Sequence, residues 1–401
     1  MILTLGKRVA FEAAYRLDYP HWSEERFREQ FGKRLRQGSS LGGNFDAWFV
    51  FTGPVDQKSG MMINVADIKS RVNRLLASRY DHKFLNDDNP SFKDKPPTVE
   101  NIARQLFDDA VGLFDDTEAK LLACHLVESP EAEATAYADR VERKSSIQFS
   151  AARRTEAPML SAEENRHLFG PATNDHGHQY DLRVTLSGDV DPESGQIVSE
   201  RQLREVLQEL FERLDHKHLN NDLPELKQLP ITTESLAGWM FHELVKDIPV
   251  DRVTLKENPW FEVDYDRHEN CRVNVIDHFR AAHRLHSPQL SDEENLAIFG
   301  KCNNLNGHGH RYKFQVGVVG GIDQQSGTVM NLADLVNGVR KAVSEWDGVF
   351  IDREFDIFKA QASTSENIVS MLSEQVEREL GREVSRVRLW ETDNNRFTLR
   401  G

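Results

Sequence analysis

Residues 300–312 read GKCNNLNGHGHRY. One thiol, Cys302, precedes two histidines, His308 and His310, which are two positions apart. In a β-strand, side chains at i and i+2 lie on the same face about 7 Å apart, so this pair can bind one metal ion. The flanking glycines allow close approach of a neighbouring backbone. The stretch therefore predicts a strand that carries two metal ligands.

A third candidate ligand is His283, at the end of residues 273–283. That segment and residues 308–319 both have the alternating, β-branched pattern of strands, and they can pair side by side. Three neutral imidazoles with an open fourth position are typical of catalytic zinc. An isolated H-x-H is more often ordinary strand sequence. His283 and Cys302 together favour the metal site over that alternative.

The chain also aligns with itself three times. The motifs FEAAYRL, FSAARR and FRAAHRL begin at residues 11, 149 and 279. Later landmarks keep the same order, including a Glu after an apolar run at Glu128, Glu257 and Glu391. A period of about 130 residues is the size of a domain and too long for a solenoid repeat. We therefore divide the chain into unit 1 (1–140), unit 2 (141–268) and unit 3 (269–401).

Unit 3 reads as two strands, two helices and two strands. A capping box at residues 291–294 predicts a short helix between the first two strands. Apolar residues at helical spacing predict helices over 331–346 and 364–380, and a hairpin over 384–400 closes the unit. Polar stretches near 129–144 and 264–270 are expected to be linkers between units.

The other two units lack part of the metal motif. Unit 2 has His176 and His178, but Arg153 stands where unit 3 has His283, and Pro171 and Ala172 lie near the expected thiol position. Unit 1 has residues 43–46 in place of the H-x-H and Tyr15 in place of the third ligand. We expect a complete metal site only in unit 3.

Composition excludes several classes of partner. The chain has 401 residues and a formal net charge of −15, which argues against a nucleic-acid or anionic-membrane surface. No apolar stretch approaches the roughly 18 residues of a membrane span, and the first residues lack the pattern of a signal peptide. Three cysteines are unlike a disulfide framework. We expect a cytoplasmic protein with reduced thiols.

The residues of unit 3 resemble the 6-pyruvoyltetrahydropterin synthase and 6-carboxytetrahydropterin synthase family, and units 1 and 2 resemble it more weakly. The matching stretches follow in family order at residues 279–283, 290–295, 299–312, 327–335 and 390–392. The resemblance implies the α+β tunnelling fold (T-fold), in which each ββααββ unit has a four-stranded antiparallel sheet with helices on one face. Three tandem units would close into a pseudo-trimeric twelve-stranded barrel with the helices outside. Two such barrels would stack as a homodimer, a pseudo-hexamer.

The resemblance also implies a chemistry. The substrate would be 7,8-dihydroneopterin triphosphate, and Zn²⁺ would be held by His283, His308 and His310. Cys302, as a thiolate, would move a side-chain proton. Glu391 would accept hydrogen bonds from the pterin, with Thr364 and Glu366 nearby. The candidates for holding the triphosphate are Lys301, Arg284, Arg311 and Lys313.

Unit 3 departs from the family at one position. Gly348 follows Asp347 where the family has an Asp-His pair, whereas Asp81-His82 and Asp215-His216 are intact in units 1 and 2. A composite site is one interpretation, in which unit 1 or unit 2 donates its pair to Cys302. The alternative is that these pairs only anchor a helix–loop junction.

The spacing Cys-x5-His-x-His is similar to the pyruvoyl branch of the family. The leading hypothesis is a zinc-dependent lyase that eliminates triphosphate and yields 6-pyruvoyltetrahydropterin. One alternative uses the same substrate but releases acetaldehyde and yields 6-carboxytetrahydropterin, on the route to queuosine. Another alternative is a non-catalytic pterin-binding or assembly protein.

Overall fold

The structure is a computed structural model that describes residues 1–33 and 35–401. Unit 1 contains β1 (Ile2–Arg16), α1 (Glu24–Phe31), β2 (Ser40–Thr52), α2 (Val65–Arg79), β3 (Lys83–Phe84), α3 (Leu85–Asp88), η1 (Pro90–Phe92), α4 (Val99–Val111), η2 (Gly112–Phe114), β4 (Lys120–Ser129) and β5 (Ala132–Tyr137). Unit 2 contains β6 (Val141–Arg153), α5 (Ala162–Phe169), η3 (Gly170–Thr173), β7 (His176–Gly188), α6 (Glu200–Leu214), β8 (Lys217–His218), α7 (Leu219–Asp222), η4 (Pro224–Leu226), α8 (Thr233–Leu244), β9 (Val250–Asn258) and β10 (Phe261–Asp266). Unit 3 contains β11 (Cys271–His283), α9 (Asp292–Phe299), η5 (Gly300–Asn303), β12 (His308–Gly320), α10 (Leu332–Val343), β13 (Val349–Phe350), α11 (Ile351–Glu354), η6 (Asp356–Lys359), α12 (Ser365–Leu380), β14 (Arg386–Thr392) and β15 (Asn395–Arg400).

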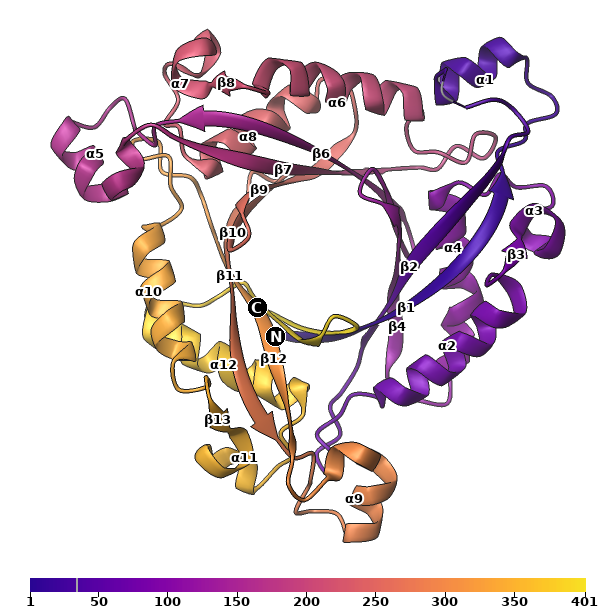
Figure 1. Cartoon of the computed structure of the whole chain (residues 1–401), viewed down its shortest axis with the longest axis vertical. Coiled ribbons are helices and arrows are strands. Elements are labelled where there is room, and N and C mark those ends of the chain that lie inside the picture. Colours follow the sequence, from indigo (N-terminus) through magenta and orange to yellow (C-terminus); the bar gives the residue numbers. More distant parts are fainter. Residues whose placement is uncertain (34) are drawn as a thin grey trace.

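The long strands form one closed antiparallel barrel. Twelve of them follow one another in the order β10-β9-β7-β6-β5-β4-β2-β1-β15-β14-β12-β11, and β10 pairs with β11 to close the ring. The short strands β3, β8 and β13 add parallel to β1, β6 and β11. Figure 1 looks down the ring and shows the helices on its outside. The predicted fold is confirmed.

Local sequence explains the elements around the site. Ser291 and Glu294 form the predicted capping box at the start of α9. The side chains of Asn331 and Thr364 cap α10 and α12, so the helices begin where the sequence predicts. The predicted strands 273–283 and 308–319 correspond to β11 and β12.

Each unit joins the next through its last strand, and we call these contacts seams. Seam 1–2 pairs β5 with β6, seam 2–3 pairs β10 with β11, and seam 3–1 pairs β15 with β1. Seam 3–1 aligns Ile2 with Arg400, so the two ends of the chain lie side by side (Figure 1). A closed ring leaves none of its twelve strands as an unpaired edge.

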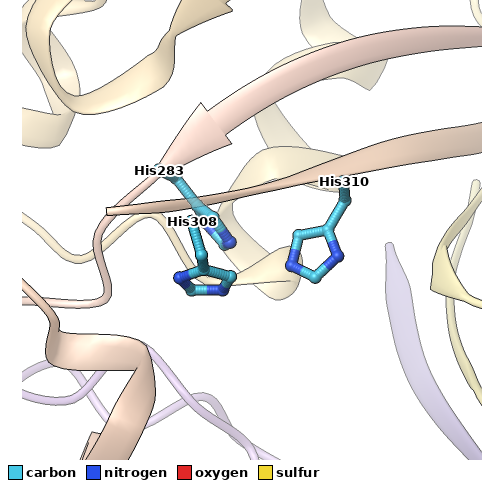
Figure 2. Close-up of side chains that lie close together, drawn as sticks. All are labelled: His283, His308 and His310. Carbon is cyan, nitrogen blue, oxygen red and sulfur yellow. The ribbon is translucent and has the colours of Figure 1, made fainter. Parts of the chain in front are cut away.

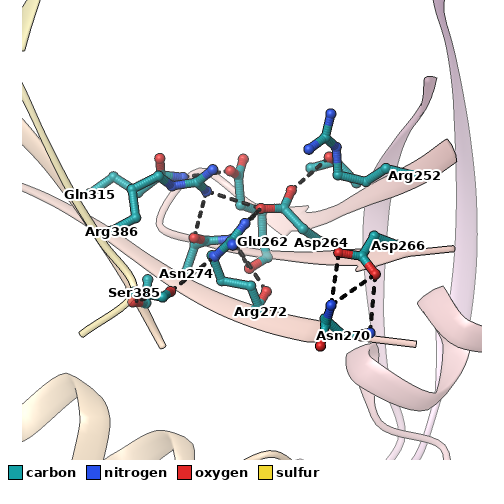
Figure 3. A network of polar contacts seen from close by, with 12 residues as sticks. Arg252, Glu262, Asp264, Asp266, Asn270, Arg272, Asn274, Gln315, Ser385 and Arg386 are labelled. Carbon is teal, nitrogen blue, oxygen red and sulfur yellow. Dashed lines mark hydrogen bonds and ion pairs between the residues drawn. The ribbon is translucent and has the colours of Figure 1, made fainter. Parts of the chain in front are cut away.

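Side chains along the strands alternate between the helices and the barrel interior. In β10, Val263 and Tyr265 are buried on the side of α8, where Tyr265 lies against Gly238. Asp264 therefore projects to the opposite face. There it lies 3.0 Å from Arg386 and 3.4 Å from Arg272, at the centre of the network in Figure 3. Ion pairs on this inner face link units 2 and 3 at their seam.

The predicted linkers are wrong. Residues 129–144 contain β5 and the beginning of β6, and residues 264–270 contain the end of β10 and a turn. Glu133 and Thr135 on β5 are buried polar side chains, and the intervening Ala134 and Ala136 are fully buried. A strand with one polar face and one face of alanines lacks the usual β-branched pattern, which is why its sequence resembles a linker.

None of the helices in residues 1–33 and 35–401 is both long and apolar enough to cross a membrane.

Candidate active site

Two neighbouring strands bring the three predicted ligands together. In the register of β11 and β12, His283 lies opposite His308, and Ala281 lies opposite His310. The ring centroid of His283 is 4.6 Å from that of His308 and 5.3 Å from that of His310. Figure 2 shows the three imidazoles converging on one side of these strands. The sequence prediction that these residues share one face is confirmed.

A glycine makes the entry into β12 possible. Gly307 has φ +73°, a conformation that other residues rarely adopt. A Cβ atom at this position would lie 2.6 Å from the ring of Phe350 and 2.9 Å from the carbonyl oxygen of His283. The chain therefore needs glycine here to place His308 beside His283.

The arrangement fits a metal ion. One candidate ligand atom from each of the three histidines lies within 4.8 Å of the other two, and in residues 1–33 and 35–401 no other group of His, Cys, Asp or Glu does this. His308 Nδ1 and His310 Nε2 are buried without a hydrogen-bond partner. Buried polar atoms without partners are costly, and a metal ion would satisfy both.

The environment of His283 prepares it as a ligand. Its side chain is fully buried, and its Nδ1 lies 3.0 Å from the carbonyl oxygen of Ser363, which can only accept a hydrogen bond. Nδ1 therefore carries the proton, and Nε2, which lies 3.3 Å from the Tyr312 hydroxyl, has the lone pair that would bind a metal. Burial lowers the pKa of His283 to about 3. The imidazole is neutral at physiological pH, as a metal ligand must be.

The thiol lies in η5, just before the H-x-H strand. Cys302 is half-buried, and its carbonyl oxygen accepts a hydrogen bond from Leu285 N at 3.0 Å, which ties η5 to the end of β11. Burial raises the pKa of the Cys302 thiol and the charge of Glu391 raises it further, whereas Lys301 lowers it. Forming a thiolate here therefore needs an additional positive charge close by.

Glu391 lies near the end of β14, and each oxygen of its carboxylate faces a different neighbour. Its Oε1 lies 3.7 Å from His310 Nε2, and its Oε2 accepts a hydrogen bond from Asn395 Nδ2 at 3.1 Å. Of the residues predicted to bind substrate, Glu391 therefore lies directly beside the three histidines.

The other two residues predicted to bind substrate, Thr364 and Glu366, contact unit 1. Thr364 Oγ1 donates to the carbonyl oxygen of Gly60 at 2.6 Å, and Glu366 accepts from Met62 N at 3.1 Å. Unit 1 thus lies against the site of unit 3. The equivalent Thr98 and Thr232 donate to Gly195 and Gly327 in the same way at the other two seams.

Comparison with known proteins agrees with this architecture. The family described as 6-pyruvoyl tetrahydropterin synthase matches residues 4–139, 142–268 and 272–401. The chain belongs to this family. It is 45% identical to the 6-pyruvoyl tetrahydrobiopterin synthase of Homo sapiens over 125 residues, which are 31% of this chain and 86% of that protein. The corresponding figures for the enzyme of Drosophila melanogaster are 38% over 126 residues, 31% and 75%.

A solved structure of the same family is also similar. The 6-pyruvoyl tetrahydropterin synthase of Caenorhabditis elegans is 39% identical, covers 33% of this chain and 96% of its own, and has a TM-score of 0.32. Each relative thus corresponds to about one third of this chain. The remaining two thirds also match the family model, and the structure shows how they differ.

In unit 2 an internal ion pair occupies the position equivalent to the site of unit 3. Arg153 lies opposite His176, as His283 lies opposite His308, and its Nη2 is 2.6 Å from Glu257. Glu257 corresponds to Glu391, and its other oxygen is 3.2 Å from His178. A cavity of about 470 Å³ remains there, lined also by residues of unit 3. Thr155 N bonds Ala172 O, so Ala172 takes the place of Cys302.

In unit 1 a tyrosine, Tyr15, occupies the position that His283 has in unit 3. The Tyr15 hydroxyl donates to Glu128, the equivalent of Glu391, at 2.5 Å. Tyr15 lies opposite Leu41 and Ala13 lies opposite Gly43. The residues equivalent to the H-x-H are therefore Leu41 and Gly43, and the sequence alignment to residues 43–46 was wrong by two positions. Neither side chain can bind a metal ion.

The two intact Asp-His pairs lie apart from this site within the chain. The Asp81 carboxylate accepts from Glu12 N at 3.1 Å and lies 3.0 Å from His82 Nδ1, and Asp215 lies 2.6 Å from His216 Nδ1. The two imidazoles are 76% and 83% exposed. Neither pair forms a hydrogen bond or ion pair with Cys302 within residues 1–33 and 35–401.

The predicted phosphate-binding cations lie in different surroundings. Arg284 Nε donates to Asn303 Oδ1 at 2.9 Å and holds the thiol-bearing η5. Lys313 lies over the ring of Trp390, and Arg311 is exposed. Sequence reasoning missed the carbonyl of Ser363, because a backbone group that orients a histidine leaves no signature in residue type.

Proposed function

We propose that this chain is a zinc-dependent lyase that eliminates triphosphate from 7,8-dihydroneopterin triphosphate to give 6-pyruvoyltetrahydropterin, at one site per chain. The observation that carries the proposal is the convergence of three imidazoles, with the Glu391 carboxylate 3.7 Å from one of them. Units 1 and 2 fill the same position with Tyr15 or Arg153.

The proposed roles follow from the contacts. His283, His308 and His310 would hold Zn²⁺, which supplies a Lewis acid for negative charge developing on the side-chain oxygens of the substrate. The Ser363 carbonyl fixes the proton of His283 on Nδ1. Cys302 would take the side-chain proton, and a bound metal ion would supply the positive charge that favours its thiolate against the raised pKa. Glu391 would accept hydrogen bonds from the amino group and ring N–H of the pterin.

An Asp-His pair would assist Cys302 from outside unit 3. His82 and His216 have φ of 55° and 56°, which costs energy for a residue with a side chain, whereas unit 3 has Gly348 at φ 80°. Retention of strained, exposed histidines favours a functional role over simple anchoring. We propose that two chains form a homodimer and that one chain donates a pair to Cys302 of the other.

Mixed dimers test this donation. Chains with Cys302→Ala are co-expressed with chains that carry both His82→Ala and His216→Ala. Donation between chains restores one of the two sites in each mixed dimer, so purified mixed dimers should show about half of wild-type turnover. If each chain uses its own pair, mixed dimers stay inactive. Single His82→Ala and His216→Ala chains identify which pair is needed, and light scattering measures whether the protein is a dimer.

Mass analysis of the product decides the reaction. The protein is incubated with 7,8-dihydroneopterin triphosphate, and the release of inorganic triphosphate with 6-pyruvoyltetrahydropterin supports the proposal. Release of acetaldehyde with 6-carboxytetrahydropterin would show the carbon–carbon cleavage instead. Absence of turnover in a protein that contains zinc would favour a binding role.

We also propose that the protein is cytoplasmic and has no nucleic-acid partner. The net charge of −15 supports this, because a strongly negative protein repels the phosphate backbone.

A further inference from the structure

A lysine from unit 1 reaches the edge of the unit 3 site. Lys7 of β1 is paired in register with Asn395 of β15 at seam 3–1. The Lys7 side chain donates to Asn395 Oδ1 at 2.7 Å, and the two residues are only 9% and 8% exposed. Burial and the charge of Lys69 lower the pKa of Lys7, whereas Glu391 raises it.

This contact continues to the carboxylate of the site. Asn395 Nδ2 donates to Glu391 Oε2 at 3.1 Å, while Glu391 Oε1 faces His310 at 3.7 Å. A lysine ammonium has only donors, so it fixes the Asn395 amide with its oxygen towards Lys7. The amide NH₂ then faces Glu391 Oε2, which accepts this hydrogen bond. The three side chains therefore form a chain of hydrogen bonds, in which Lys7 donates to Asn395 and Asn395 donates to Glu391.

The other two seams lack these residues. Seam 2–3 pairs Val275 with Phe261 at the equivalent position. At seam 1–2, Glu133 pairs with Lys144, so the next residues along the strands, Ala132 and Ser145, occupy it. In unit 2, Glu257 is bonded instead by Arg153. In unit 1, Glu128 is bonded by Tyr15. Arg153 and Tyr15 both occupy the position that His283 has in unit 3. Within the part of the chain that the structure describes, Glu391 is bonded through Asn395 and Lys7 of the seam, and no residue equivalent to Arg153 or Tyr15 bonds it.

We propose that Lys7 and Asn395 are positioning residues that hold the Glu391 carboxylate in one orientation, and thereby set the affinity of unit 3 for a 2-amino-4-oxo heterocycle. The inference rests on the proposed function, because it assumes that Glu391 accepts the N–H groups of such a ring. It adds that the site is shared between the first and last units of one chain.

Binding is measured with 6-methylpterin, a pterin without a phosphorylated side chain, on the whole zinc-loaded chain. Lys7→Met should raise its Kd about tenfold, since hydrogen bonds to charged groups are individually worth about this factor or more. In turnover assays KM should rise while kcat changes little, because the anchor binds substrate and transition state alike. Zinc content should not change. Lys7→Arg should restore the affinity to within a few-fold of wild type.

Two further variants separate orientation from folding. Asn395→Ala, which installs the residue found at this position in unit 1, should raise the Kd in the same way. Ser145→Ala, at the position equivalent to Lys7, should leave it unchanged. An unchanged Kd in both Lys7→Met and Asn395→Ala overturns the inference while the proposed function stands. Failure of the wild type itself to bind pterin would remove the proposed function and the inference with it.

Discussion

The guanidinium of Arg153 and the carboxylate of Glu257 are 2.6 Å apart, and both are buried. They occupy the positions that His283 and Glu391 have in unit 3. The pair thus holds positive charge where unit 3 would hold a metal ion, and it uses the carboxylate that would otherwise contact a ligand. Unit 2 thus has the same strand arrangement as the site of unit 3, but an internal ion pair stands where unit 3 has a candidate metal ligand and the Glu391 carboxylate.

Arg153→His should create a second metal site. Unit 2 already has His176 and His178 on the strand opposite, so the substitution completes a trio like that of unit 3. Metal analysis should show an increase from about one to about two zinc ions per chain. Tyr15→His is the matched control, because Leu41 and Gly43 supply no further ligands, and its zinc content should stay at about one.

His308→Ala should abolish zinc binding. Removing one of three ligands leaves two imidazoles, which do not form a stable catalytic zinc site. Zinc should fall from about one per chain to near zero, while His176→Ala in unit 2 should retain it. Zinc that persists in the His308 variant would place the metal elsewhere.

Glu391→Gln should lower kcat/KM by about 10- to 100-fold, because a neutral amide replaces the charged acceptor and presents a donor to the ring N–H. The equivalent Glu257→Gln should keep full activity but unfold at a lower temperature, since Arg153 would lose its buried counter-charge. Similar activity losses in both variants would contradict the assignment of one working site.

Glu234→Gln should change how stability depends on pH. Burial raises the pKa of Glu234 to about 7, from an ordinary value of 4.5. The folded state therefore favours the protonated carboxyl, and its stabilisation is lost as pH rises from about 4.5 through 7. The variant should gain stability relative to wild type between pH 5 and pH 8, by up to about 3 kcal/mol. If the difference in melting temperature between variant and wild type is the same at pH 5 and at pH 8, this prediction is wrong.

Asp264→Asn should destabilise the barrel at seam 2–3. Arg386, Arg272 and Arg252 hold the pKa of Asp264 well below its usual range despite burial. The resulting stabilisation is present at neutral pH and is lost only when strong acid protonates the carboxylate. Breaking a buried ion cluster costs about 3–5 kcal/mol. Asp356→Asn, in the exposed pair with Lys359, should leave the melting temperature unchanged.

Local patterns sufficed to predict much of the site. The alternation of β11 and β12 placed His308 and His310 on one face, and the repeated FxAA motif indicated that His283 ends the neighbouring strand. The capping box at Ser291 predicted the start of α9, because its side chains bond backbone groups within a few residues, and apolar spacing predicted α10 and α12.

Contacts between distant residues could not be predicted in this way. Lys7 and Asn395 are 388 positions apart, and only closure of the barrel brings them together. The strand β5 was mistaken for a linker because its polar face is buried in the barrel interior rather than exposed. The shift at Leu41 and Gly43 arose because unit 1 has no histidines to mark the register.

Closure by β1 and β15 within one chain has a further consequence. In a ring of identical chains, every substitution is made three times, so a change that improves one interface at the expense of catalysis damages all sites at once. Here the residues at each of the three interfaces are encoded separately, so one interface can change while the other two stay the same. Tyr15, Arg153 and His283 occupy equivalent places and do three different things, an asymmetry that symmetric assembly forbids.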